Sequence, residues 1–90
     1  MRITRRYLIS GRVQGVGFRA FTETQAAVEG LHGWVRNLPD GEVEVLFEGD
    51  AESVDRLETS IRRGPAQARV ADVETEAMPP AHRVTGFEIR

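Results

Sequence analysis

Three glycines frame a short segment that could bind an anion. Gly11, Gly15 and Gly17 lie between a run typical of a strand and a run typical of a helix, and Arg19 follows. Glycine adopts the backbone conformations that let successive N–H groups converge on one anion, and the helix N-terminus adds about half a positive charge. A cation there opposes the helix dipole, so a bound anion would explain Arg19. A surface arginine on a tight turn is the equally favoured alternative.

Two nucleotide-binding motifs do not account for this segment. Residues 15–20 match the pattern G-x-G-x-x-A of dinucleotide-binding domains. Such a domain needs further βα units and an acid at the end of a second parallel strand, for which this chain is too short. A P-loop is excluded because no Gly-Lys-Ser/Thr is present. The glycine segment is therefore interpreted as an anion site in a different fold.

The hydrophobic periodicity indicates a short α+β domain around this segment. The predicted elements are strand 7–13, helix 18–28, strands 33–38 and 42–48 around the turn Pro39–Gly41, helix 51–63, strand 70–75 and strand 86–90. Asp50 is the predicted N-cap of the second helix, and Gly30 and Gly64 are predicted to end the two helices. The order β-α-β-β-α-β, with one extra strand, predicts a ferredoxin-like sandwich with two helices on one face of an antiparallel sheet. We expect a single domain over residues 1–90.

Acidic residues interrupt two of these patterns. In strand 42–48, Glu42, Glu44 and Glu48 alternate with apolar residues, so we expect them on the solvent side and not as an acid–base pair. Glu29 stands where the apolar stripe of the first helix calls for an apolar residue. We therefore expect weaker packing of that helix.

Charge and composition exclude several classes of function. The first 36 residues carry six arginines and two acids, whereas residues 37–90 carry six arginines and twelve acids. This balance favours a small anionic ligand over nucleic acid. The chain has no cysteine, which excludes disulfides and thiol catalysis and makes a cytoplasmic location the default expectation. No apolar run approaches 18 residues and no signal peptide follows the basic start, so neither a membrane span nor export is expected.

Two longer motifs give the chain a resemblance to a known family. Residues 9–19, ISGRVQGVGFR, are similar to the first signature of acylphosphatases, and residues 33–43, GWVRNLPDGEV, running on to Gly49, are similar to the second. The last four residues, FEIR, resemble the usual end of the family. The resemblance covers nearly the whole chain and implies the ferredoxin-like fold. Glu29 and the irregular connection 78–84 depart from the family pattern.

The resemblance also implies an activity and a site. It implies a metal-independent enzyme without cofactors that hydrolyses the carboxyl–phosphate bond of acyl phosphates to a carboxylate and inorganic phosphate. Asn37 would position the attacking water, although from its sequence context alone it is better interpreted as a turn residue. His32 and His82 are isolated, so no metal site is expected. The residues that would hold the phosphate are Gln14, Gly15, Val16, Gly17, Phe18 and Arg19.

Two other functions stay open at this stage. A ferredoxin-like module could bind phosphate or carbamoyl phosphate without turnover, as a part of larger hydrogenase-maturation proteins; an end at residue 90 without zinc-finger cysteines favours a free-standing enzyme. RNA binding on the sheet is the least favoured, because only Tyr7, Trp34 and Phe47 could supply the exposed aromatics it needs. We expect a monomer whose partners are a small-molecule acyl phosphate and inorganic phosphate, with neither nucleic acid nor membrane.

Overall fold

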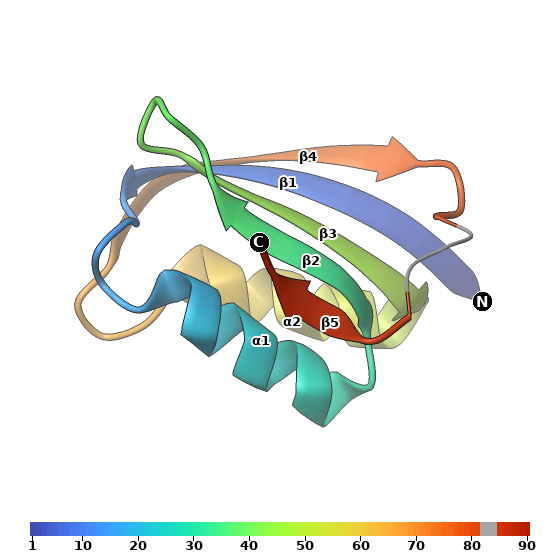
Figure 1. The fold of residues 1–90 in the computed structure, drawn as a ribbon. Helices are drawn as coiled ribbons and strands as arrows, with labels where there is room; N and C mark the ends of the chain where they lie inside the picture. The colour runs from blue at the N-terminus through green and yellow to red at the C-terminus, as the bar shows by residue number, and fades with distance from the viewer. Residues whose placement is uncertain (82–84) are drawn as a thin grey trace.

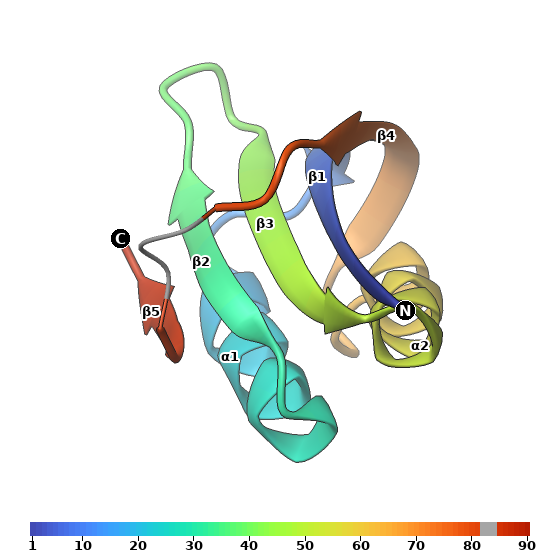
Figure 2. The same cartoon turned by 90° about the vertical axis from the view of Figure 1, so that its right-hand side faces the viewer.

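Five strands form one sheet in the computed structural model, which describes residues 1–81 and 85–90 (Figure 1). The strands are β1 (Arg2–Arg12), β2 (His32–Asn37), β3 (Val43–Asp50), β4 (Arg69–Met78) and β5 (Phe87–Ile89), and the helices are α1 (Phe18–Glu29) and α2 (Ala51–Arg63). The strand order is β4-β1-β3-β2-β5, and both helices cover the same face of the sheet (Figure 2). The predicted ferredoxin-like α+β fold is confirmed.

The extra strand pairs in a direction that the sequence did not indicate. β1, β2, β3 and β4 pair antiparallel, whereas β5 runs parallel to β2, with Phe87 opposite Gly33. β4 finishes at the end of the sheet where β2 begins, because Met78 and Glu48 both lie opposite Thr4 and His32 lies opposite Glu48. β5, the next strand in the chain, also begins at that end and therefore runs in the direction of β2.

The helices pack on the sheet through the apolar stripes that the periodicity predicted. The ring of Tyr7 on β1 meets that of Phe47 on β3 edge-on, with centroids 5.7 Å apart. Burial of such side chains is the main source of stability in a small domain. The largest fully buried side chains are Tyr7, Phe18, Phe47, Ile9, Leu57, Ile61, Val13, Val35, Val43, Val45, Val54 and Thr22.

The predicted helix ends are confirmed. The carboxylate of Asp50 caps α2 by accepting the backbone N–H of Glu52 at 3.2 Å. Gly30 adopts the left-handed conformation that commonly ends a helix, with φ of 67°, and Gly64 follows the last turn of α2. Glu29 does more than interrupt a stripe, because its carboxylate lies 2.8 Å from the guanidinium of Arg56 and joins α1 to α2.

The prediction that Glu44 and Glu48 face solvent is wrong. Both side chains lie on the face opposite the helices but are buried, each residue with only 4% of its surface exposed. The reason is the place of β3 at the centre of the sheet, where long side chains from the neighbouring strands close over it. Glu42 comes before the strand and stays partly exposed.

Arginines from both neighbours neutralise Glu44. Its carboxylate accepts from Nε of Arg6 on β1 at 2.6 Å and from Nε of Arg36 on β2 at 2.5 Å. Burial raises the pKa of the Glu44 carboxyl, but the hydrogen bonds from Arg36 and Arg6 outweigh it and hold the pKa below its ordinary value. This cross-strand bridge links β1, β3 and β2 on the sheet face opposite the helices, called the open face below.

Glu48 forms a second buried network at the other end of β3. Its carboxylate accepts from the hydroxyl of Thr4, the guanidinium of Arg2 and the backbone N–H of Ala81 at 2.7 Å. These hydrogen bonds, that of Thr4 foremost, lower the pKa of Glu48 despite its burial. The connection that follows β4 is thereby held against the sheet, while part of it, including His82, lies outside the described residues.

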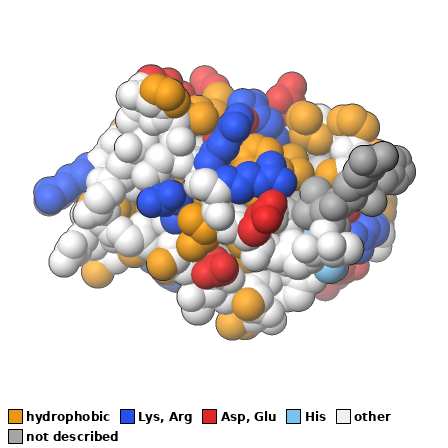
Figure 3. Space-filling view, in the orientation of Figure 1, with side chains coloured by type: hydrophobic (Ala, Val, Ile, Leu, Met, Phe, Trp, Pro, Cys, Tyr) orange, Lys and Arg blue, Asp and Glu red, His pale blue; other side chains and the backbone are white. Residues whose placement is uncertain are grey.

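Among the described residues, the sheet face opposite the helices does not present the aromatic pair that an RNA-binding sheet needs. Tyr7 and Phe47 are buried on the helix side. Trp34 remains on the open face, where the guanidinium carbons of Arg36 and Arg90 lie 5.2 and 5.0 Å from its ring centroid. Figure 3 shows basic side chains gathered over the region where β2 runs past the C-terminal residue.

In the described parts of the chain, no helix combines the length and apolar character needed to cross a membrane.

Replacing Glu44 by Gln should destabilise the protein at neutral pH and flatten its response to acid. The folded-state pKa of Glu44 is lowered, so its stabilisation is complete above the unfolded-state pKa near 4.5 and is lost as the pH falls through the folded-state value. Loss of the charge should reduce the free energy of unfolding by about 1–3 kcal/mol at pH 7. Urea unfolding at pH 7 and pH 3 measures both effects. Glu74→Gln, at an exposed position on β4, is the control; equal pH dependence in the wild type and Glu44→Gln would contradict the prediction.

Candidate active site

The loop between β1 and α1 is fixed at both ends by the core. Val13 is buried after β1, and Phe18 is buried at the start of α1. Gly15 and Gly17 between them have φ of 73° and 78°, in the left-handed region that costs other residues about 1–2 kcal/mol. The glycine spacing noted in the sequence therefore sets the loop's path.

The first turn of α1 has no side-chain cap in the described structure. Gly17 is the N-cap, no acidic residue lies in the first turn, and the first helical hydrogen bond runs from Phe21 N–H to the Gly17 carbonyl at 3.0 Å. The amides of residues 18–20 consequently keep their donor capacity at the positive end of the helix dipole. Such an end favours an anion.

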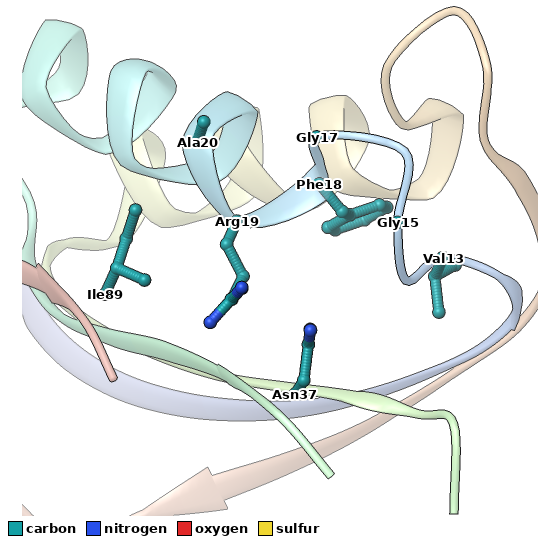
Figure 4. Close-up of a pocket in the computed structure, with 8 residues that line it drawn as sticks. All are labelled: Val13, Gly15, Gly17, Phe18, Arg19, Ala20, Asn37 and Ile89. Atoms are coloured by element: carbon teal, nitrogen blue, oxygen red, sulfur yellow. The ribbon is translucent and has the colours of Figure 1, made fainter.

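A pocket of about 220 Å³ lies beside this helix end. In Figure 4 the guanidinium of Arg19 and the carboxamide of Asn37 point into the same space from opposite sides. The volume is below the roughly 300–1,000 Å³ typical of sites for drug-sized ligands, so it suits a small group. Its lining consists of Val13, Gly15, Gly17, Phe18, Arg19, Ala20, Asn37 and Ile89.

Arg19 enters the pocket from the first turn of α1. One of its Nη atoms donates to the backbone carbonyl of Arg90 at 3.3 Å. Among the described residues no Asp or Glu side chain forms an ion pair with it, in contrast to Arg6 and Arg36 on the open face. A guanidinium carries five N–H donors, so one hydrogen bond leaves most of them for a ligand.

Asn37 is the last residue of β2 and lies opposite Val43 at the base of the β2–β3 hairpin. A turn asparagine would bond its side chain to the nearby backbone. Within the described residues no such hydrogen bond holds the Asn37 carboxamide, which points into the pocket (Figure 4). The geometry thus brings Asn37 to Arg19 although 18 positions separate them in the sequence.

The other predicted loop residues differ in what they contribute. Gly15, Gly17 and Phe18 line the pocket. Val16 packs its side chain on the core. Gln14 turns its side chain away, and its Nε2 donates to the carbonyls of Leu38 and Glu42 at 2.8 and 2.9 Å.

Three lining residues were not singled out from the sequence: Val13, Ala20 and Ile89. Val13 and Ala20 flank the predicted loop, so their positions follow from it. Ile89 reaches the pocket because β5 pairs with β2, where it lies opposite Val35. No local signal in the sequence reveals that pairing.

His32 has a structural contact. Its Nδ1 accepts the backbone N–H of Gly86 at 2.7 Å, which fastens the chain just before β5. Within the residues that the structure describes, no three His, Asp or Glu side chains lie close enough to hold a metal ion.

Comparison with known proteins decides the family. The family model for acylphosphatases matches residues 5–89. An acylphosphatase of Pseudomonas paraeruginosa is 55% identical over 82 residues, which are 91% of this chain and 89% of that protein. The chain belongs to the acylphosphatase family.

Solved acylphosphatase structures have the same fold. The crystal structure of the Bacillus subtilis acylphosphatase superposes with a TM-score of 0.94 at 33% identity and covers 100% of this chain and 99% of that one. The Coxiella burnetii acylphosphatase gives a TM-score of 0.94 at 34% identity, over 99% and 93% of the two chains. The prediction of an enzyme, a hydrolase of the acylphosphatase family, is confirmed by these comparisons.

Proposed function

We propose that this pocket hydrolyses acyl phosphates to a carboxylate and inorganic phosphate, with the phosphate held by residues 14–19 and the water positioned by Asn37. One observation supports the proposal above others. The glycine loop, the uncapped first turn of α1, Arg19 and Asn37 meet in a single small pocket. Family membership agrees with this chemistry.

The phosphate is held by positive charge and by oriented donors. The loop glycines Gly15 and Gly17 and the first turn of α1 line the pocket, and the Arg19 guanidinium approaches from the same side. Arginine stays charged at any physiological pH and offers phosphate a planar pair of N–H donors. Donors fixed in this way stabilise the charge on the equatorial oxygens as the phosphoryl group is transferred.

The attacking water needs orientation more than deprotonation. At neutral pH a carboxamide is no base, but its oxygen accepts a hydrogen bond from water and its nitrogen donates one. Asn37 stands across the pocket from loop residues Gly15 and Gly17 (Figure 4), which supports its proposed role: a water held by its carboxamide would lie beside the phosphorus of a phosphate bound to the loop. The phosphate itself takes up the proton that the water loses.

The leaving group needs no acid from the protein. An acyl phosphate is a mixed anhydride, and cleavage of the phosphorus–oxygen bond releases a stable carboxylate. This fits the pocket lining, in which the described residues include no Asp, Glu or His. Arg19 supplies the positive charge that faces the phosphate, and the backbone amides supply further donors. Because no metal ion is needed for this, we expect hydrolysis of an aryl acyl phosphate to be insensitive to a chelator.

The same proposal includes the setting of the enzyme. We place it in the cytoplasm, as the cysteine-free sequence favours. Over the described residues the large hydrophobic side chains left exposed are Met1, which precedes β1, Val28 on α1 and Ile89 on β5. Scattered apolar residues do not make an oligomer interface, so we expect a monomer acting on a small-molecule substrate.

Arg19→Gln should lower kcat/KM by about 10²–10³-fold. The guanidinium contacts the phosphate in the ground state and the transition state, so phosphate affinity should fall together with turnover. Steady-state kinetics with an aryl acyl phosphate measures the loss. Arg63→Gln, at an exposed position in the last turn of α2, controls for loss of one charge. An Arg19→Gln enzyme that keeps more than about a tenth of its kcat/KM would remove Arg19 from the mechanism.

Inorganic phosphate should inhibit competitively and raise the melting temperature, because it occupies the same pocket and binds only the folded protein. At a phosphate concentration of 100 times Kd the stabilisation should reach about 2.7 kcal/mol. Thermal unfolding in a phosphate series, with matched sodium sulfate and chloride series, measures it. The proposed phosphate loop would be refuted if tens of millimolar phosphate changed neither quantity, or changed both equally in Arg19→Gln.

Asn37→Ala separates an enzyme from a phosphate-binding module. If Asn37 orients water, kcat should fall by about 10²-fold or more while the phosphate inhibition constant and the melting temperature stay nearly unchanged. If Asn37 is a structural turn residue, the variant should lose roughly 1 kcal/mol of stability, and activity should fall only in step with unfolding. Measuring kcat, phosphate inhibition and unfolding on the same preparation decides between these two roles.

A further inference from the structure

The Gln14 side chain joins the two halves of the active site. Its Nε2 donates to the carbonyl oxygens of Leu38 at 2.8 Å and Glu42 at 2.9 Å. Both partners are acceptors, so the contacts also fix which end of the carboxamide is the nitrogen. A carboxamide nitrogen has two N–H donors, and this pair of hydrogen bonds uses both of them.

The two acceptors lie at the base of the hairpin that carries Asn37. Leu38 follows Asn37 directly, and its N–H donates to the Glu42 carbonyl at 2.8 Å, while the Gly41 N–H donates to the Leu38 carbonyl at 3.1 Å. Each of the two carbonyls therefore accepts one hydrogen bond from the hairpin and one from Gln14. Gln14 therefore binds the residue that follows β2, Leu38, and the residue that precedes β3, Glu42. Leu38 is the next residue after Asn37.

Among the described residues, no backbone hydrogen bond joins the loop to the hairpin at this point. The β1–β3 ladder ends at Ile9 opposite Val43, and beyond it β1 has a bulge at Ser10 and Gly11 and stays paired with β4 as far as Arg12. Among the described residues, the two hydrogen bonds of Gln14 are those that join loop residues 13–17 to hairpin residues 38–42. Beside the core packing of Val13 and Phe18, the Gln14 side chain is thus the hydrogen-bonded link between the loop and the hairpin that carries Asn37.

We propose that Gln14 is a positioning residue, whose side chain sets the Asn37 carboxamide relative to the phosphate loop. This proposal rests on the function proposed above. The side chain of Gln14 acts through Asn37 and not on the phosphate, because it is absent from the pocket lining; the part of Gln14 in the proposed phosphate loop is its backbone. Loss of the side chain should therefore reduce turnover more than phosphate affinity, since the loop amides and Arg19 stay on the other side of the pocket.

The test compares Gln14→Met with Gln14→Lys. Methionine has nearly the same length and removes both donors, so kcat should fall at least tenfold while the inhibition constant of inorganic phosphate changes less than twofold. Lysine can donate to both carbonyls with its ammonium group, so Gln14→Lys should recover most of the lost kcat. Asp40→Ala, which removes the carboxylate that accepts the Glu42 N–H at 3.0 Å, loosens the hairpin tip without touching Gln14 and should keep its kcat.

A double-mutant cycle shows whether the effect passes through Asn37. In the Asn37→Ala background, Gln14→Met should lower kcat by less than twofold, because the group that it positions is gone. A kcat unchanged in Gln14→Met, an equal loss of phosphate affinity, or a full further loss in the Asn37→Ala background would each overturn the proposal. If Arg19→Gln and Asn37→Ala are impaired while Gln14→Met is not, the positioning role fails and the proposed hydrolysis stands.

Discussion

An uncapped helix end is the constraint on which the rest of the site depends. Most helices satisfy their first N–H groups with a side chain, but the first turn of α1 has neither a capping side chain nor an acid. Donors kept open in this way need a backbone that cannot relax to satisfy them internally. Val13 and Phe18, buried on either side of two glycines in left-handed conformations, supply that rigidity. The core thus keeps the first N–H groups of α1 without a capping side chain, at some cost in helix stability.

The central position of β3 explains how charges came to be buried in so small a protein. A central strand has neighbours on both sides, so arginines from β1 and β2 can reach its glutamates while keeping part of their own surface in water. Removing one partner of such a bridge costs more than the bridge itself contributes, because it strands the remaining charge. The open face therefore needs no second layer of helices, and both helices remain on the side where the site is built.

How much was predictable depended on the range of the interaction. Periodicity and capping chemistry located both helices, and the alternation of Tyr7 and Ile9 identified the core face of β1. The same alternation gave the correct face for Glu44 but the wrong exposure. It indicates which residues share a face and not whether neighbouring side chains will cover that face. β1 also begins five residues earlier than its apolar pattern, since arginines and threonine at its start are held by pairing on both sides. The parallel entry of β5 depends on where β4 ends, which no local pattern encodes.

The candidate site residues also differ in whether a local pattern or only a long-range contact identifies them. The glycines and Arg19 could be selected from their own spacing, because an anion site at a helix N-terminus is built from consecutive residues. Asn37 could not, since its sequence context is that of an ordinary turn and only the family resemblance singled it out. The structure shows why: the sheet brings the end of β2 to the loop, and among the described residues the carboxamide of Gln14 joins the loop to the hairpin by hydrogen bonds. In the role proposed above, Gln14 sets the distance between the loop and Asn37 although its residue type suggests no chemical role. Such a residue becomes visible only when its hydrogen-bond partners are known.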